Sequence, residues 1–211
     1  MLRKKNYLLT LLCLFWAASS VLAQSSRQTS VSLTNEEKAL LEEQAMAKVM
    51  TFQEHCALIG AKEKSYSERK SYIAPTIELF VDKDRTIEVS QLGKKKPRRR
   101  TVEEYLLRLS KMNYQKVKID SYDCHIANEF KKSVAMNQKH PGEEWYEGIV
   151  SVIQTFRGER GDYVYEDVVK RNLTVYTKKV VTLRGNRIRK SWIIQLGDIK
   201  VTEVDEKHKM N

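Results

Sequence analysis

The second half of the sequence restricts the fold most strongly. After Asn113, β-branched and aromatic residues dominate four long runs, at about residues 114–128, 145–157, 163–183 and 188–204. These residue types favour β-strands. Gly185-Asn186 suits a tight hairpin turn between the last two runs, and residues 158–162 allow a looser turn between the second and third. The four runs therefore predict an antiparallel meander.

The first half carries helix signals. Thr34 with Glu37, and Thr101 with Glu104, each match a capping box, in which a hydroxyl and a carboxylate bind free amides at the start of a helix. After the first box, apolar residues recur at steps of three and four until Gly60, and they are Leu41, Ala45, Val49, Phe52, Cys56 and Ile59. The helix after the second box has the apolar residues Val102, Tyr105, Leu106, Leu109 and Met112. The spacing predicts a first and a third amphipathic helix.

The segments between these helices are less regular. Residues 67–80 predict a second helix that Pro75 kinks or breaks. The alternation in residues 86–91, together with Phe80-Val81, predicts a short hairpin or an edge strand. The polar residues 131–144 predict an exposed loop. The sequence thus predicts an α+β domain, with three N-terminal helices packed on a curved antiparallel sheet.

The N-terminus has the pattern of a secretory signal peptide. Arg3, Lys4 and Lys5 precede an apolar stretch at residues 7–18, and Val21-Leu22-Ala23 provides a cleavage site after Ala23. Cys13 lies inside the apolar stretch and not at the cleavage point, which argues against a lipoprotein. We expect an exported protein, periplasmic or secreted. Its expected organisation is a signal peptide at 1–23, a flexible leader at 24–33, one domain at 34–204 and a C-terminal tail at 205–211.

The composition is that of a basic globular protein. Among 211 residues, 38 Lys and Arg face 27 Asp and Glu, so the formal net charge is +11. No later stretch approaches the roughly 18 uncharged apolar residues of a membrane span, which excludes a polytopic membrane protein. Six basic residues cluster before the third helix, namely Lys94, Lys95, Lys96, Arg98, Arg99 and Arg100.

This basic cluster has two possible structural interpretations. It is either a solvated loop or a site for an anionic polymer or membrane surface, because such clusters attract polyanions by releasing counterions. Residues 93–101 contain no aromatic side chain that could stack on a base, which argues against nucleic acid.

The cysteines and histidines predict no metal site. Cys56 and Cys124 are the thiols outside the signal peptide, and they either pair in a disulfide or stay as two free thiols. The pairs His55-Cys56 and Cys124-His125 have zinc-ligand types, but neither has the usual loop between its ligands. Catalytic-triad, P-loop and dinucleotide signatures are absent from the sequence, and we expect no cofactor.

The order of elements, with segments such as IAPTIELF, TVEEYLLRL, YEDVVKRNLTVY and WIIQLGDIKV, resembles the nuclear transport factor 2-like (cystatin-like α+β cone) superfamily. It looks most like secreted bacterial members, over about residues 34–204. The resemblance implies a sheet wrapped round helices, with a cavity at the open end, and it allows a homodimer. For an isomerase or dehydratase it would require an Asp base and a Tyr donor in the cavity. Asp120, Asp123, Tyr105 and Tyr122 are the candidates.

Three functional hypotheses follow. The first is a non-catalytic exported domain that engages a partner protein or a small ligand through the cone cavity or the sheet face. The second is a small cavity enzyme of isomerase or dehydratase type with an Asp/Tyr pair. The third is a binder of anionic polymers or envelope surfaces through residues 94–100.

Overall fold

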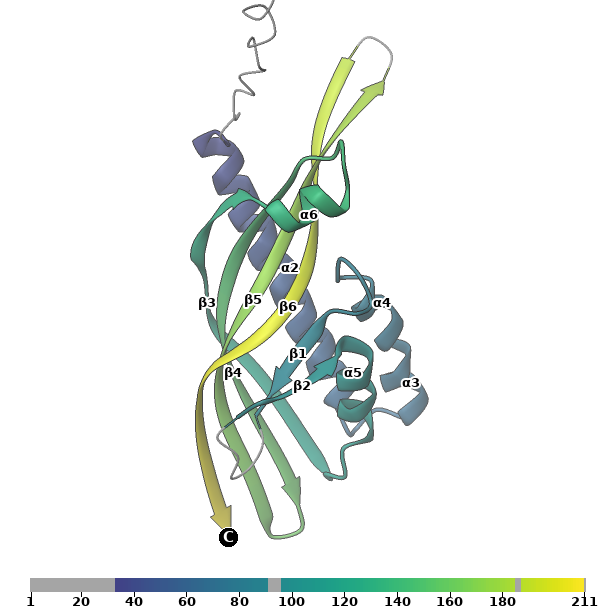
Figure 1. Ribbon diagram of the computed structural model, residues 1–211. Helices are drawn as coiled ribbons and strands as arrows, with labels where there is room; N and C mark the ends of the chain where they lie inside the picture. Colours follow the sequence, from purple (N-terminus) through teal and green to yellow (C-terminus); the bar gives the residue numbers. More distant parts are fainter. Residues whose placement is uncertain (1–32, 91–95, 185–186, 211) are drawn as a thin grey trace, which may run out of the picture. The chain divides into compact units, whose positions relative to one another are not determined.

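The computed structural model describes residues 33–90, 96–184 and 187–210. The predicted signal peptide and nearly all of the leader lie outside these residues, as do Lys94, Lys95 and the Gly185-Asn186 turn. The described residues from Thr34 onward form one compact unit of α+β type (Figure 1). In its described part, six strands form one sheet in the order β2-β1-β6-β5-β4-β3.

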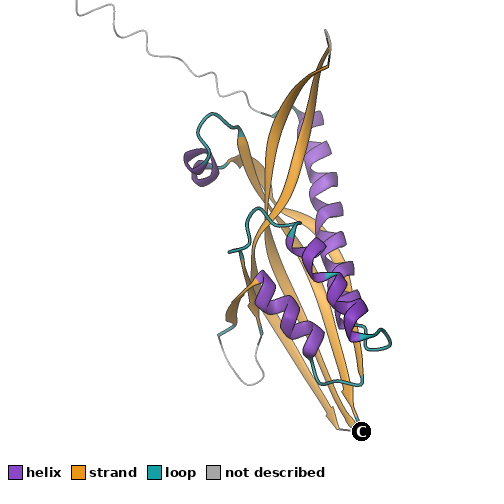
Figure 2. Cartoon of the chain, turned by 90° about the vertical axis from the view of Figure 1, so that its right-hand side faces the viewer, coloured by secondary structure: helices purple, strands orange, loops and turns teal. Residues whose placement is uncertain are grey.

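The first helix, α2 (Asn35–Gly60), begins where the sequence predicts. The Thr34 hydroxyl accepts the Glu37 amide, and the Glu37 carboxylate accepts the Thr34 amide, so the capping box is confirmed. All six predicted apolar positions are buried, and they are Leu41, Ala45, Val49, Phe52, Cys56 and Ile59. This apolar face lies against the sheet (Figure 2).

The predicted second helix is two short helices, α3 (Tyr66–Ser71) and α4 (Ile73–Ile77). The break at Tyr72 follows from Pro75, whose ring would collide with the carbonyl of Ser71 in a continuous helix. Both pieces pack beside α2 and α5 (Val102–Lys111). The guanidinium of buried Arg69 donates to the Ser110 carbonyl at 2.5 Å, which fastens α3 to the last turn of α5.

The predicted meander is confirmed. β3 (Lys116–Lys132), β4 (Trp145–Arg160), β5 (Tyr163–Arg184) and β6 (Arg187–Met210) pair antiparallel in sequence order. The turn between β4 and β5 is shorter than predicted, because both strands continue to Gly161-Asp162. β6 also continues past Val204, where the sequence predicts a tail, and pairs with β5 as far as Met210.

The other edge of the sheet differs from the prediction. β1 (Thr86–Val89) is not an edge strand, because it lies between β6 and β2 (Arg98–Thr101). It runs parallel to β6, with Ile87 opposite Ile199, so the sheet is mixed and not purely antiparallel. Phe80 and Val81 do not pair with β1. Their segment instead bonds to Leu196, whose carbonyl accepts the Val81 amide at 2.9 Å.

The predicted loop 131–144 also differs. Its first residues extend β3, and α6 (Val134–Lys139) follows. Met136 on this short helix is 2% exposed and packs against Trp145 and Tyr176. The buried Met136 side chain thus helps to attach this helix to the sheet.

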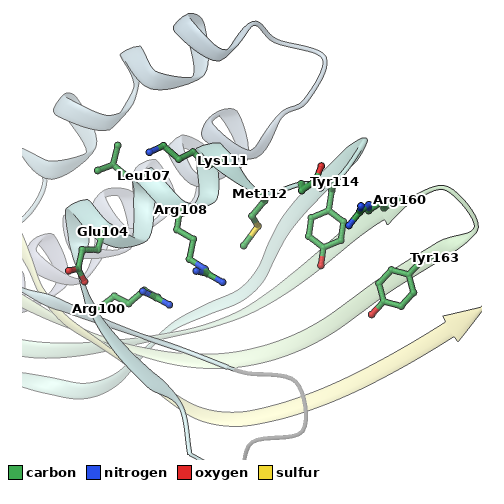
Figure 3. A pocket seen from close by; sticks show the side chains of 10 residues that line it. Arg100, Glu104, Leu107, Arg108, Lys111, Met112, Tyr114, Arg160 and Tyr163 are labelled. Carbon is green, nitrogen blue, oxygen red and sulfur yellow. The ribbon is translucent and has the colours of Figure 1, made fainter.

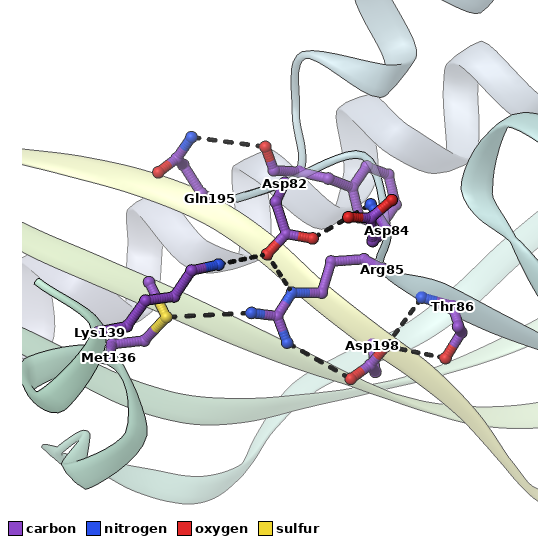
Figure 4. Close-up of polar contacts among 9 residues, drawn as sticks. Asp82, Asp84, Arg85, Thr86, Met136, Lys139, Gln195 and Asp198 are labelled. Atoms are coloured by element: carbon purple, nitrogen blue, oxygen red, sulfur yellow. Dashed lines mark hydrogen bonds and ion pairs between the residues drawn. The ribbon is translucent and has the colours of Figure 1, made fainter.

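Arg85 joins three segments that are distant in sequence (Figure 4). Its guanidinium lies 3.1 Å from a carboxylate oxygen of Asp82, 3.5 Å from one of Asp198, and 5.1 Å from the centre of the Tyr176 ring. Asp198 on β6 also accepts the backbone amide and the hydroxyl of Thr86, both at 2.8 Å. These contacts attach the start of β1 to β6.

This cluster predicts an acid-sensitive contribution to stability. Burial by itself would raise the pKa of Asp198, but the Thr86 hydrogen bonds and Arg85 hold it below its ordinary value of 3.8. A lowered folded-state pKa means that the stabilisation is present above the unfolded-state pKa and is lost as the pH falls through the folded-state value.

We therefore expect Asp198→Asn to be less stable than the parent chain at pH 7, with a difference that shrinks towards about pH 3. Urea denaturation across this pH range measures it. Asp120→Asn is the control, because Asp120 is an exposed residue whose ion pair with Lys118 contributes little. A difference for Asp198→Asn that stays constant with pH would contradict the expectation.

Candidate functional site

A pocket of about 810 Å³ lies beside α5, β2 and the β4–β5 hairpin (Figure 3). It combines cationic side chains with aromatic and apolar ones. Its lining consists of Arg100, Glu104, Leu107, Arg108, Lys111, Met112, Asn113, Tyr114, Arg160 and Tyr163.

Helix periodicity explains the contribution of α5. Tyr105, Leu106 and Leu109 are buried against the rest of the domain. Residues Arg108 and Lys111, three positions apart, therefore share the opposite, solvent-facing side of the helix and reach the pocket. The same amphipathic pattern that docks α5 thus places two cations beside the pocket.

Strand alternation explains Arg100. Neighbouring residues on a strand point to opposite faces of the sheet. On β2, Arg99 forms an ion pair with Glu88 of β1 at 3.4 Å. Arg98 and Arg100 belong to the opposite face, where Arg100 lines the pocket.

The aromatic wall depends on a glycine. The ring of Tyr114 lies so close to Gly158 of β4 that a Cβ atom there would be 2.7 Å from it. The same ring meets Phe156 edge-on, with 5.8 Å between centres. Partial burial raises the pKa of Tyr114, and the nearby Tyr163 and Asp167 raise it further. The raised pKa favours the neutral hydroxyl. Tyr163 at the start of β5 is 39% exposed.

Positive charge exceeds negative charge among the described residues that line the pocket. Among the residues that the structure describes, none forms an ion pair with Arg100, Arg108, Lys111 or Arg160. The carboxylate of Glu104 accepts the backbone amide of Thr101 in the second capping box.

The four cations therefore face one carboxylate that is already engaged. Partial burial and the charges of Arg98 and Arg108 lower the pKa of Arg100, while Glu104 acts in the opposite direction. Such a site suits anions, because guanidinium groups bind carboxylates and phosphates in a bidentate geometry.

Of the described residues of the predicted basic cluster, Arg100 alone lines this pocket. Lys94 and Lys95 lie outside the described residues, and Lys96, Arg98 and Arg99 are exposed. The expected loop is in part strand β2, which positions Arg100. Sequence reasoning missed Arg108, Lys111 and Arg160. The polar face of the third predicted helix was a signal for the first two, whereas nothing local indicated Arg160.

The predicted Asp/Tyr candidates do not meet. Asp120 on β3 pairs with Lys118 at 2.8 Å and is exposed. Asp123, at a positive φ of 51°, pairs with His125 at 3.3 Å. Tyr122 is 50% exposed on β3.

Tyr105 lies apart from these residues in the core. It is buried on α5, where burial raises its pKa. The four candidates therefore form no acid–base pair.

A different Asp/Tyr contact occurs on β5. Buried Asp167 accepts the Tyr165 hydroxyl at 3.0 Å and the Ser90 hydroxyl at 2.9 Å. Sequence reasoning did not single out Asp167, since nothing in its neighbourhood indicates that its side chain is buried. Asp167 does not line the pocket.

Cys56 and Cys124, the cysteines among the described residues, are free thiols. Cys56 is buried on α2, and Cys124 is half-buried on β3. His55 contacts the Thr76 hydroxyl at 3.0 Å, and His125 contacts the Asp123 carbonyl at 3.1 Å. Within the described residues, no group of three His, Cys, Asp or Glu side chains could hold a metal ion. No helix in that part of the chain has the length and apolarity to cross a membrane.

Comparisons with protein-family models, with curated proteins and with solved structures find no match to this chain.

Proposed function

We propose that this chain is an exported, non-catalytic binding domain of nuclear transport factor 2-like cone fold, and that it binds an organic anion in the pocket beside β2. The observation that carries the proposal is the uncompensated positive charge of that pocket. It joins two of the sequence-based hypotheses, since the ligand site lies at one end of the predicted basic cluster.

The arrangement of elements supports the proposed fold. A long helix, a broken second helix, a hairpin, a third helix and a four-stranded meander follow one another along the chain. The hairpin joins the meander through β1 and β6. In this arrangement α2 and α5 cover one face of a curved sheet, as in a cone (Figures 1 and 2).

The pocket has a size suited to an organic ligand. Its volume of about 810 Å³ lies in the range of known small-molecule sites. Leu107 and Met112 supply apolar surface for the body of a ligand, and the cations supply partners for its charge. The resulting electrostatic attraction would weaken with added salt.

Arg108→Gln tests the proposal. We expect it to weaken citrate binding to the full chain about tenfold, or about 1.4 kcal/mol, because it removes a charge-assisted hydrogen bond. Isothermal titration calorimetry at low salt measures this effect. Lys116→Gln is the matched control, because Lys116 lies outside the pocket, is 81% exposed and pairs with Glu159. Equal affinities for the parent chain and Arg108→Gln would refute the proposal.

A further inference from the structure

The cations of the pocket form two separate groups. In Figure 3, Arg100 and Arg108 lie on one side and Arg160 on the other, with Met112 and Tyr114 between them. The first group belongs to β2 and α5, and Arg160 ends β4. A small anion with one charged group can reach one group of cations. A ligand that uses both needs two negative groups separated by an uncharged body.

The pocket is also open to a longer ligand. Arg108, Lys111 and Arg160 are exposed although they line it. Beyond the pocket, the positive charge continues through Arg98 of β2 and Lys96, which precedes that strand. Neither residue forms an ion pair with another described residue. A chain that carries repeated negative charges could leave the pocket along this track.

The tyrosines favour sugar rings over nucleobases as the uncharged body. Nucleic acids bind such sites by stacking successive bases on accessible aromatic faces. One face of Tyr114 is covered by Gly158, so Tyr163 is the more accessible ring. One base could stack on Tyr163, but successive bases would find no second open ring, because residues 96–101 contain no aromatic side chain. The hydroxyls of a sugar, in contrast, can bond to tyrosine hydroxyls and to Asn113.

We infer that the pocket binds an acidic oligosaccharide, in which the bodies of the sugar rings separate successive carboxylate or sulfate groups. The inference rests on the proposed anion-binding function and adds the class of the ligand. One negative group lies against Arg100 and Arg108, a ring lies along Tyr114 and Tyr163, and the next negative group reaches Arg160. Arg160 is then the residue that distinguishes oligomers from single acidic sugars.

Calorimetry on the full chain tests this inference with galacturonate, trigalacturonate and the single-stranded DNA hexathymidylate. We expect trigalacturonate to bind at least about tenfold more tightly than galacturonate. Arg160→Gln should bring the ratio of the two affinities close to one, because it removes the cation that the second negative group reaches. Arg157→Gln is the matched control on the same strand, because Arg157 pairs with Glu159 and Glu166 and does not line the pocket.

The outcomes separate the inference from the function on which it rests. Equal affinities for galacturonate and trigalacturonate, with citrate still bound, would overturn the oligosaccharide and leave the anion site in place. Tighter binding of hexathymidylate than of trigalacturonate would overturn it in favour of nucleic acid. Failure of citrate and of all three other probes to bind would overturn both proposals. Two further probes, vesicles with sulfated lipid headgroups and sulfated trisaccharides, test for a membrane. If the vesicles bind more tightly than both trigalacturonate and the sulfated trisaccharides, the ligand is a membrane surface and the inference is also overturned.

Discussion

Phe52→Ala is expected to lower the free energy of unfolding by about 3–5 kcal/mol. Phe52 on α2 is 2% exposed and meets Phe80 edge-on, with 5.4 Å between ring centres. The backbone of Phe80 in turn pairs with that of Leu196 on β6. The lost ring would therefore leave a cavity between α2, the segment that precedes β1 and the sheet. Urea denaturation followed by circular dichroism measures the loss.

Leu40→Ala is the control for this substitution. Leu40 is on the same helix but is 41% exposed, so we expect a change within about 0.5 kcal/mol. A loss below about 1 kcal/mol for Phe52→Ala would show that α2 does not pack on the sheet through this ring.

Cys56 is expected to react with iodoacetamide at least about a thousandfold more slowly in the folded chain than in the unfolded one. Burial raises the pKa of its thiol to about 12, although Arg171 and the hydrogen bond with Tyr105 act in the opposite direction. The ordinary value is 9.0. The reactive species is the thiolate, and this rise in pKa lowers the thiolate population at pH 8 about a thousandfold. Peptide mass spectrometry of labelled chains measures each cysteine separately.

Cys124 provides the internal comparison. It is half-buried, and burial followed by Asp123 raises its pKa. We expect it to be labelled before Cys56 in the folded chain and at a similar rate in urea. Equal labelling rates of Cys56 with and without urea would contradict the burial of α2.

Local signals predicted the regular part of the fold. The Thr34 and Thr101 capping boxes define helix starts because they depend on residues three positions apart. The four runs of strand-forming residues defined the meander, because consecutive strands joined by short turns pair with each other.

Long-range contacts determined what the sequence did not predict. β1 lies beside β6 because Ile87 is buried opposite Ile199, and no local pattern indicates such a partner. The three consecutive arginines of β2 are typical of a solvated loop. They form a strand because their backbone pairs with β1. The polar sequence around Met136 likewise gave no sign that its side chain enters the core.

The candidate site was only partly predictable for the same reason. The basic cluster pointed to Arg100 as an anion ligand. Its neighbours Arg108 and Arg160 come from a helix and a hairpin that the sheet brings together. The Asp/Tyr hypothesis chose residues by type, and these lie on β3 and α5, whereas the structure buries Asp167 beside a tyrosine. Burial of a polar group depends on the whole fold and leaves little trace in neighbouring residues.

The parallel contact between β1 and β6 has a consequence for the order of folding. The partners are separated by on the order of a hundred residues, and loops of that length close late because their closure costs much chain entropy. The β4–β5 hairpin can form from neighbouring residues, but β1 and, through it, β2 join the sheet only when β6 is in place. We therefore expect Arg100 of β2 to reach the pocket late in folding, so that the complete set of cations is present only in the finished sheet.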